Sequence, residues 1–213
     1  MLTAIKSQMN PHFFYNALNT IQSYIFSDNK KQAAYYLNKF SNLTRLILEM
    51  SEKETVKLSE EIKALLLYLE LEKVRFDQNF NFSINIDKNI DTDMIRIPSM
   101  MVQPYVENAI KHGLLHKKGN KELHISFSRT NEDLLIEVSD NGIGRKLSTE
   151  INKVRMEKHH SFSTGANSKR LEILNRGRLN AIGVMYIDHE DENQLATGTT
   201  VKITIPIKSS PKT

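Results

Sequence analysis

The chain has 213 residues, of which 25% are charged and 39% hydrophobic, and its formal net charge is +4 at pH 7. This composition is typical of a globular protein with one or two domains, and the scattered Lys and Arg residues do not indicate a nucleic-acid partner. The absence of cysteine excludes disulfides, thiolate metal sites and cysteine nucleophiles. No apolar run of the sequence reaches the ~18 residues that a membrane span needs.

The first 52 residues predict two helices, because apolar residues recur at helical spacing on both sides of a polar break at residues 27–31. The apolar residues of the first helix are Leu2, Ile5, Met9, Phe13, Leu18, Ile21 and Ile25. Those of the second helix are Ala34, Leu37, Phe40, Leu43, Ile47 and Met50. Two helices with so short a loop form an antiparallel hairpin, which cannot bury its apolar stripe alone. We therefore predict a homodimer whose two hairpins form a four-helix bundle.

The rest of the chain predicts a domain of mixed helices and strands. A polar linker at residues 51–57 leads into a helix that Ser59 is expected to cap. Alternating apolar residues predict strands at 80–86, 122–128, 133–139, 183–188 and 200–207. Further helices are expected at 101–113 and 168–176, and the aperiodic segment 145–168 predicts a lid or a disordered loop. The predicted fold class is α+β, with a helical hairpin in residues 1–52 and a second domain in residues 57–208.

The stretch SDNGIGRK, residues 139–146, follows one of the predicted strands. The Asp140 carboxylate could accept a hydrogen bond from an adenine amino group, and Gly142 and Gly144 would let the backbone approach a ligand without a Cβ atom. An ordinary turn is the competing interpretation, because Asp-Asn-Gly is a common turn signal. Taken alone, this motif favours the turn.

The stretch VENAIKHG, residues 106–113, lies on a predicted helix. Spacings of three and four residues place Asn108, Lys111 and His112 on one face of that helix. An amide oxygen suits Mg²⁺, and a lysine ammonium suits phosphate, although a solvated polar face is the common alternative. The stretch TGTTVKI, residues 197–203, is either an anion-binding nest or a turn into an edge strand.

The stretch QMNPHFFYN, residues 8–16, places a proline directly before His12 within a predicted helix. Pro11 cannot donate to the helix ladder, so the helix bends there. We hypothesise that the bend tips His12 outward and makes the helix easy to deform. Asn16 lies four residues further on and could orient the imidazole by a hydrogen bond. A surface histidine beside a proline kink is the alternative interpretation.

The ordered set VENAIKH, DNGIG, RLEILN and GTTVKITIPI resembles the ATP-binding domain of the GHKL superfamily. With QMNPHFFYNALNTI and LSEEIKALLLYLELEKVRF placed before it, nearly the whole chain resembles the LytS/YesM-type sensor histidine kinases. The resemblance implies a GHKL-type sandwich of a mixed sheet with helices on one face. It also implies that ATP phosphorylates His12, and that the phosphoryl group then passes to an aspartate of a response regulator. A membrane sensor region would precede Met1, so the chain would be the cytoplasmic portion of a bacterial inner-membrane protein.

The resemblance also implies the roles of individual residues. Asn108 matches an Mg²⁺-coordinating asparagine, and Asp140 matches the aspartate that reads adenine. Further nucleotide-binding residues implied by the resemblance are Lys111, His112, Gly142, Gly144, Gly165 at the hinge of the lid, Lys169, Arg170, Gly198 and Thr199.

Two departures from the family pattern affect the expected chemistry. Only Gly165 remains in the lid where two glycines are usual, and Lys169 and Arg170 are expected to compensate. Pro104 stands where the chaperone and gyrase relatives carry a water-activating glutamate, which favours transfer to a side chain over ATP hydrolysis. Glu107 is the nearest acid and a candidate catalytic residue, and its role as a base is left open.

A protein of another class is the alternative. The chain could be a degenerate, non-catalytic dimerising module that binds nucleotide, or nothing, and relays a signal by contact. The irregular lid favours this alternative. The presence of His12, Asn108, Asp140 and Gly144 in one chain argues against it.

Overall fold

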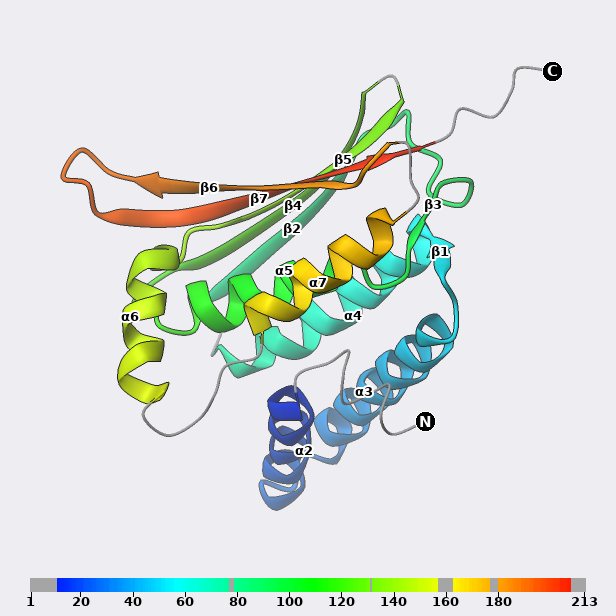
Figure 1. The fold of residues 1–213 in the computed structure, drawn as a ribbon. Coiled ribbons are helices and arrows are strands. Elements are labelled where there is room, and N and C mark those ends of the chain that lie inside the picture. The colour runs from blue at the N-terminus through cyan, green and yellow to red at the C-terminus, as the bar shows by residue number, and fades with distance from the viewer. Residues whose placement is uncertain (1–10, 77–78, 131, 157–162, 177–179, 208–213) are drawn as a thin grey trace. The chain divides into compact units, whose positions relative to one another are not determined.

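A computed structural model describes residues 11–76, 79–130, 132–156, 163–176 and 180–207 (Figure 1). The chain divides into two compact units: Met1–Gln78 with Thr92–Met101, and Asn79–Asp91 with Val102–Thr213. The helix that follows the linker therefore packs with the N-terminal helices, although the sequence analysis assigns it to the second domain. These units describe packing, so the division into functional domains at 1–52 and 57–208 stays a prediction.

The first unit contains three helices, α2 (Pro11–Phe26), α3 (Lys30–Ser51) and α4 (Leu58–Arg75). A short ribbon pairs β1 (Thr55–Lys57) antiparallel with β3 (Arg96–Pro98). The tight turn between α2 and α3 places Asp28 at a positive φ of 53°, and the Asn29 side chain accepts the Gln32 N–H to cap α3. Both predicted helices are thus present, while residues 1–10 lie outside the described part of the chain.

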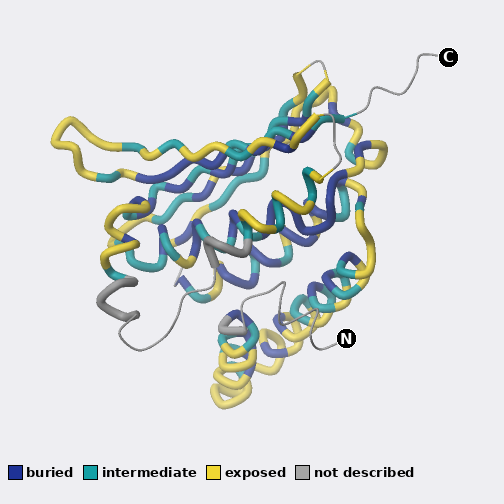
Figure 2. Tube along the Cα trace, in the orientation of Figure 1, coloured by how far each residue is buried: buried dark blue, intermediate teal, exposed yellow. Residues whose placement is uncertain are grey.

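The buried faces of α2 and α3 differ from the predicted stripes (Figure 2). On α3 the early buried residues are Ala33 and Tyr36, whereas the expected core residue Leu37 is 48% exposed. The Tyr36 hydroxyl donates a hydrogen bond to the Leu71 carbonyl oxygen of α4 at 3.0 Å. Within the single chain, the buried face at this end of α3 thus differs by one position from the predicted stripe, and Tyr36 anchors it to α4.

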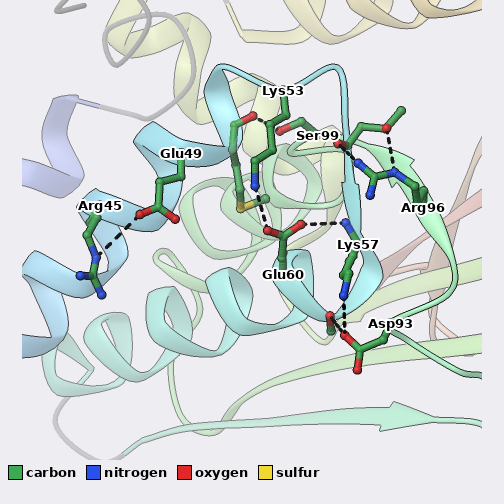
Figure 3. Close-up of polar contacts among 11 residues, drawn as sticks. Arg45, Glu49, Lys53, Lys57, Glu60, Asp93, Arg96 and Ser99 are labelled. Atoms are coloured by element: carbon green, nitrogen blue, oxygen red, sulfur yellow. Dashed lines mark hydrogen bonds and ion pairs between the residues drawn. The ribbon is translucent and has the colours of Figure 1, made fainter.

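The start of α4 corrects a second prediction (Figure 3). The helix begins at Leu58, so Ser59 lies inside it and does not cap it. Instead, the Glu60 carboxylate accepts the Lys57 backbone N–H at 2.9 Å, which satisfies a donor that a helix start leaves unpaired. The Ser59 hydroxyl donates to Asp93 at 2.8 Å. Sequence alone favours serine as the cap, whereas here a glutamate that reaches back supplies the acceptor.

The second unit is built on a mixed five-stranded sheet of order β2-β4-β5-β7-β6. The strands are β2 (Phe80–Ile86), β4 (Lys121–Thr130), β5 (Asp133–Asp140), β6 (Gly183–Glu190) and β7 (Ala196–Pro206). Strand β2 pairs parallel to β4, and the other pairs are antiparallel. The helices α5 (Gln103–Asn108), α6 (Gly144–Met156) and α7 (Ser163–Asn175) lie on one side of the sheet (Figure 1). The α+β class and the mixed sheet are thereby confirmed.

The core of this unit follows the alternation of its central strands. Every second residue of β5 is buried, from Leu134 to Asp140, and the apolar residues of β7 alternate in the same way. The aperiodic segment predicted as a lid is instead largely helical, since α6 and α7 occupy residues 144–156 and 163–175, and residues 157–162 lie outside the described part. Ion pairs from Arg145 and Lys146 join the first turn of α6 to β6. Each helix in the described ranges is too short or too polar to cross a bilayer.

Candidate functional site

Asp140 is the most unusual polar residue of the second unit. It ends β5 on the inner face and is only 8% exposed. Its Oδ1 atom accepts the Gly142 N–H at 2.8 Å. Burial raises the pKa of the carboxyl to about 6, although the hydrogen bond from Gly142 acts in the opposite direction. A buried aspartate of this kind is a candidate for specific recognition of a ligand.

The backbone of two glycines, Gly113 and Gly142, packs directly against the Asp140 carboxylate. A Cβ atom at Gly113 would lie 2.6 Å from Asp140 Oδ1, and one at Gly142 would lie 2.5 Å from it. The Ile143 N–H donates to the Gly113 carbonyl oxygen at 3.2 Å, so the DNGIG loop is joined to the end of the VENAIKHG helix. The structure therefore brings the two predicted motifs together. Sequence reasoning used Gly113 only as a helix end and missed its place beside Asp140.

Gly198 and Thr199 of β7 approach Asp140 from the neighbouring strand. Gly198 has a φ of +149°, and a Cβ atom there would lie 2.0 Å from the Asp140 backbone oxygen, so only glycine fits. Thr199 is buried and lies directly opposite Asp140 in the β5–β7 register. Both predicted residues thus lie beside the Asp140 backbone.

Asn141 anchors the loop that follows Asp140, a role that sequence reasoning missed. Its backbone N–H donates to the Glu122 carbonyl oxygen at 3.2 Å, and its Oδ1 atom accepts the Glu122 N–H at 2.9 Å. Its Nδ2 atom donates to the Asn120 carbonyl oxygen at 3.3 Å. These bonds tie the loop to the start of β4. The only sequence signal was the Asp-Asn-Gly turn itself.

The helix that carries Asn108 changes its pitch at the candidate site. The α-helix α5 ends at Asn108 and continues as a π-helix, η1 (Ala109–Leu114), whose Leu115 N–H donates to the Ile110 carbonyl oxygen at 2.9 Å. Such wide turns are rare and occur often at functional sites. Asn108 and His112 are half-buried, whereas Lys111 is exposed. Asn108, Lys111 and His112 were expected to share one helix face, but they are not equally accessible. Lys111 is the most exposed of the three.

His112 is not a cation at neutral pH. Burial lowers its pKa to about 4, and the charges of Lys111 and His116 lower it further. A neutral imidazole offers one donor and one acceptor but no charge for a phosphate. Of the three residues predicted on this helix, Lys111 is the one that supplies positive charge.

The Glu107 side chain is held by Gln103, one turn earlier in α5. The Gln103 side chain is 2% exposed, and its Nε2 atom donates to Glu107 Oε1 at 3.0 Å. Pro104 lies in the first turn of α5, where a missing N–H is tolerated. The carboxylate at 107 is thus half-buried and oriented, as a base or an ion-binding group requires.

The remaining predicted residues of this unit lie on α7. Gly165 is in the first turn of this helix rather than in an extended lid. Lys169 is exposed, and Arg170 is half-buried with its charge near Tyr105 of α5. Of the two basic residues, Arg170 is therefore the one that lies close to another element of the site.

In the first unit, His12 lies in the first turn of α2. Its side chain, and the bend expected at Pro11, lie outside the described part of the chain. The next residue, Phe13, is 5% exposed, and its ring centroid lies 5.0 Å from that of Tyr68 on α4. Asn16 is half-buried. Phe13 is therefore a core residue that fixes this turn of α2, as the apolar spacing predicts.

Comparison with known proteins assigns the family. Residues 94–209 match the model of the histidine kinase-, DNA gyrase B- and HSP90-like ATPases, and residues 1–80 match a histidine kinase model. The chain therefore belongs to the histidine kinase-, DNA gyrase B- and HSP90-like ATPase family, with an N-terminal histidine kinase region, and the expected resemblance to LytS-type kinases is confirmed.

Two curated relatives and one solved structure illustrate the likeness. Sensor protein LytS of Staphylococcus saprophyticus is 33% identical over 210 residues, which are 96% of this chain and 33% of that protein. Sensor histidine kinase/phosphatase LytS of Staphylococcus aureus Mu50 is 34% identical over 145 residues, which are 67% of this chain and 24% of that protein. The structure of Acinetobacter baumannii histidine kinase AdeS has a TM-score of 0.47 at 10% identity and covers 93% of this chain and 98% of that chain. The chain thus spans about a third of the length of the LytS proteins that it matches.

Proposed function

We propose that the chain is the kinase core of a sensor histidine kinase in a two-component system. The second unit binds Mg·ATP, His12 takes the γ-phosphoryl group, and an aspartate of a response regulator receives it afterwards. The observation that carries this proposal is the buried Asp140 carboxylate, walled by glycine backbone at the meeting point of the two motifs. The match of residues 94–209 to the ATPase family model supports the proposal.

Asp140 reads the adenine amino group in this proposal. Its Oδ1 atom already accepts the Gly142 N–H, so Oδ2 is the oxygen that accepts from the base. With a pKa of about 6, the carboxyl is mostly ionised at cytosolic pH and can accept a charge-assisted hydrogen bond. The bare backbone at Gly113 and Gly142 packs directly against the carboxylate and so fixes its orientation.

The triphosphate lies toward the helix of Asn108. Among the described residues, no group of three or more His, Asp or Glu side chains could hold a metal ion. A single amide oxygen from Asn108 fits Mg²⁺, because this ion commonly keeps its waters and binds the phosphates of the substrate. The bound ion would neutralise charge on the β- and γ-phosphates. Lys111 adds a flexible positive charge, while the neutral His112 serves as a hydrogen-bonding group.

The transfer step forms a bond between an imidazole nitrogen of His12 and the γ-phosphorus, and the bond to the β-phosphate oxygen breaks so that ADP leaves. Glu107, oriented by Gln103, is the carboxylate that we assign to accept the imidazole proton. Pro104 stands where the related ATPases carry a glutamate that activates water. Because proline has no carboxylate, this position favours the histidine over water as the acceptor.

A homodimer explains the apolar surface that the N-terminal helices leave exposed. Leu18 and Ile25 of α2 are 52% and 59% exposed, and Leu37 of α3 is 48% exposed. Large apolar side chains at helical spacing indicate a helical partner. We propose a second copy of this hairpin, which completes the four-helix bundle. The sensor region and the membrane attachment belong to the longer protein that we propose contains this chain.

Phosphorylation of the purified chain tests the proposal. With γ-labelled ATP and Mg²⁺, we expect an acid-labile, base-stable label on the wild-type chain and none on His12→Gln. The matched control is His124→Gln, which removes an exposed histidine of β4 and should keep the label. A label that persists in His12→Gln would overturn the assignment of the acceptor. Binding of ATP without any label on the wild type would instead favour the non-catalytic module.

A further inference from the structure

The first turn of α6, directly after the DNGIG loop, is bound to the edge strand β6 by one arginine. Arg145 Nε donates to Asp188 Oδ1 at 2.7 Å, and Arg145 Nη2 donates to Asp188 Oδ2 at 2.6 Å. Two parallel bonds of this kind are the most specific form of an arginine–carboxylate pair. The Arg145 Cζ atom also lies 4.8 Å from the centroid of the Tyr186 ring, within the range of a cation–π interaction. We call Arg145, Tyr186 and Asp188 the β6 clamp.

The strand register connects the β6 clamp to Asp140. Asp140 of β5 lies opposite Thr199 of β7, and Thr199 lies opposite Asp188 of β6. Directly opposite residues point to the same face of a sheet, so Asp140 and Asp188 share the inner face with one strand between them. After burial, the negative charge of Asp188 is a further cause that raises the pKa of Asp140. Arg145 supplies the positive charge that pairs with Asp188 on this face.

The β6 clamp also reaches the helix that carries Asn108. The ring centroid of Tyr186 lies 6.4 Å from that of Tyr105, a buried residue of α5 three positions before Asn108. Tyr186 thus contacts both Arg145 and Tyr105. A single residue of the edge strand contacts elements from both predicted motifs.

The first half of α6 buries few of its side chains. Of residues 144–150, only Gly144 and Ser148 are buried, and Leu147 is 46% exposed. Gly144 adopts a φ of +74°, and a Cβ atom there would lie 2.6 Å from the Cβ atom of Ala196. The backbone therefore enters α6 through a left-handed residue packed against β7, and the guanidinium of Arg145 holds the turn that follows.

We propose that Arg145 is a positioning residue for nucleotide binding, and that through Asp188 and Tyr186 it holds the Asp140–Gly144 loop in the shape that accepts adenine. This inference deepens the proposed function and rests on it. The residues of the β6 clamp do not take part in phosphoryl transfer. Their effect is on the geometry and charge of the adenine end of the site.

The adjacent residue provides a matched control. Lys146 pairs with Glu190 at 2.8 Å, and its side chain is 79% exposed. It shares the helix turn and the partner strand with Arg145 but makes one contact to a neighbouring carboxylate, and single exposed ion pairs contribute little to stability. A general effect of removing positive charge from this surface would appear equally in both substitutions.

Calorimetric titration of the chain with Mg·ATP tests the inference. We expect Arg145→Gln to raise the Kd about threefold to tenfold, the size of losing a charged hydrogen-bond pair at a half-exposed position. Lys146→Gln should stay near the wild-type value. Arg145→Lys, which keeps the charge and loses the two-bond geometry, should lie between them. The exchange Arg145→Asp with Asp188→Arg should bind more tightly than either single change.

A second measurement separates positioning from a structural role. At saturating ATP, the rate of His12 labelling in Arg145→Gln should match the wild type, so the change falls on KM rather than kcat. The melting temperature without nucleotide should match that of Lys146→Gln. Wild-type affinity in Arg145→Gln, or equal weakening in both single substitutions, would overturn the inference. A wild-type chain that takes up no ATP would instead overturn the proposed function on which the inference rests.

Discussion

Replacing Asp140 with Asn should stabilise the nucleotide-free protein at neutral pH while weakening its binding of ATP. The cause is the carboxyl at the end of β5, which is 8% exposed and has a pKa raised from 3.8 to about 6, chiefly by burial. A raised folded-state pKa means that the ionised group costs stability. The full stability is present below the unfolded-state pKa of 3.8 and is lost as the pH rises through about 6.

The magnitude follows from the two pKa values. A shift from 3.8 to about 6 corresponds to a full cost of about 3 kcal/mol at high pH. About half of this cost, roughly 1.5 kcal/mol, develops between pH 5 and pH 8, because the folded-state carboxyl titrates within that window. Asn cannot ionise, and its side-chain oxygen can still accept the Gly142 N–H. The stability difference between Asp140→Asn and the wild type should therefore grow by about 1.5 kcal/mol from pH 5 to pH 8.

Urea denaturation at several pH values measures this difference, and calorimetric titration measures ATP binding. The effect on ATP has the opposite sign, because the amide N–H₂ would face the adenine amino group, donor against donor. We expect the Kd to rise about tenfold or more, as for the loss of a hydrogen bond to a charged group. The control Asp87→Asn removes an exposed carboxylate of the same unit and should change neither property. A stability difference for Asp140→Asn that stays constant from pH 5 to pH 8 would refute this account of the carboxyl.

Two further predictions concern packing. Gly113→Ala places a Cβ atom 2.6 Å from Asp140 Oδ1, so it should cost about 1–3 kcal/mol of stability and weaken ATP binding. Gly183→Ala should do neither, because the new Cβ atom would lie 3.8 Å from the Cβ atom of Thr204. Thermal unfolding and ATP titration compare the two variants, and equal effects would contradict the crowding argument. Tyr36→Phe removes a buried hydrogen bond of 3.0 Å to a backbone carbonyl of α4 and should cost about 1 kcal/mol in urea denaturation, while Tyr35→Phe, at a residue that is 55% exposed, should cost much less. A loss at Tyr35 as large as that at Tyr36 would show that the hydrogen bond to α4 is not the cause.

Most of the helices and strands, and the short motifs, could be predicted from the residues alone. Helical spacing gave the two N-terminal helices, and alternation gave the strands of the second unit, since both signals depend only on which side of an element is buried. The residues of the candidate site were also found from short motifs, because adenine and phosphate recognition needs particular side chains and bare backbone. Asp140 and Gly142 are examples, and their contact is the Asx-type turn that the sequence Asp-Asn-Gly favours.

How these parts are held together depends on contacts that form only in the folded chain. Gly113 and Gly198 approach Asp140 from segments far away in sequence, and no local pattern records such a distance. Helix α6 escaped prediction because the many Lys, Ser, His and Asn residues of 145–168 favour a loop, although Leu147, Ile151 and Val154 stand at helical spacing. Its ion pairs to β6 through Arg145 and Lys146 form only in the folded chain. The raised pKa of Asp140 likewise comes from burial among elements that the chain brings together only on folding. Local patterns record which residues prefer water, whereas contacts between distant segments depend on register and crossing geometry that only the folded chain sets.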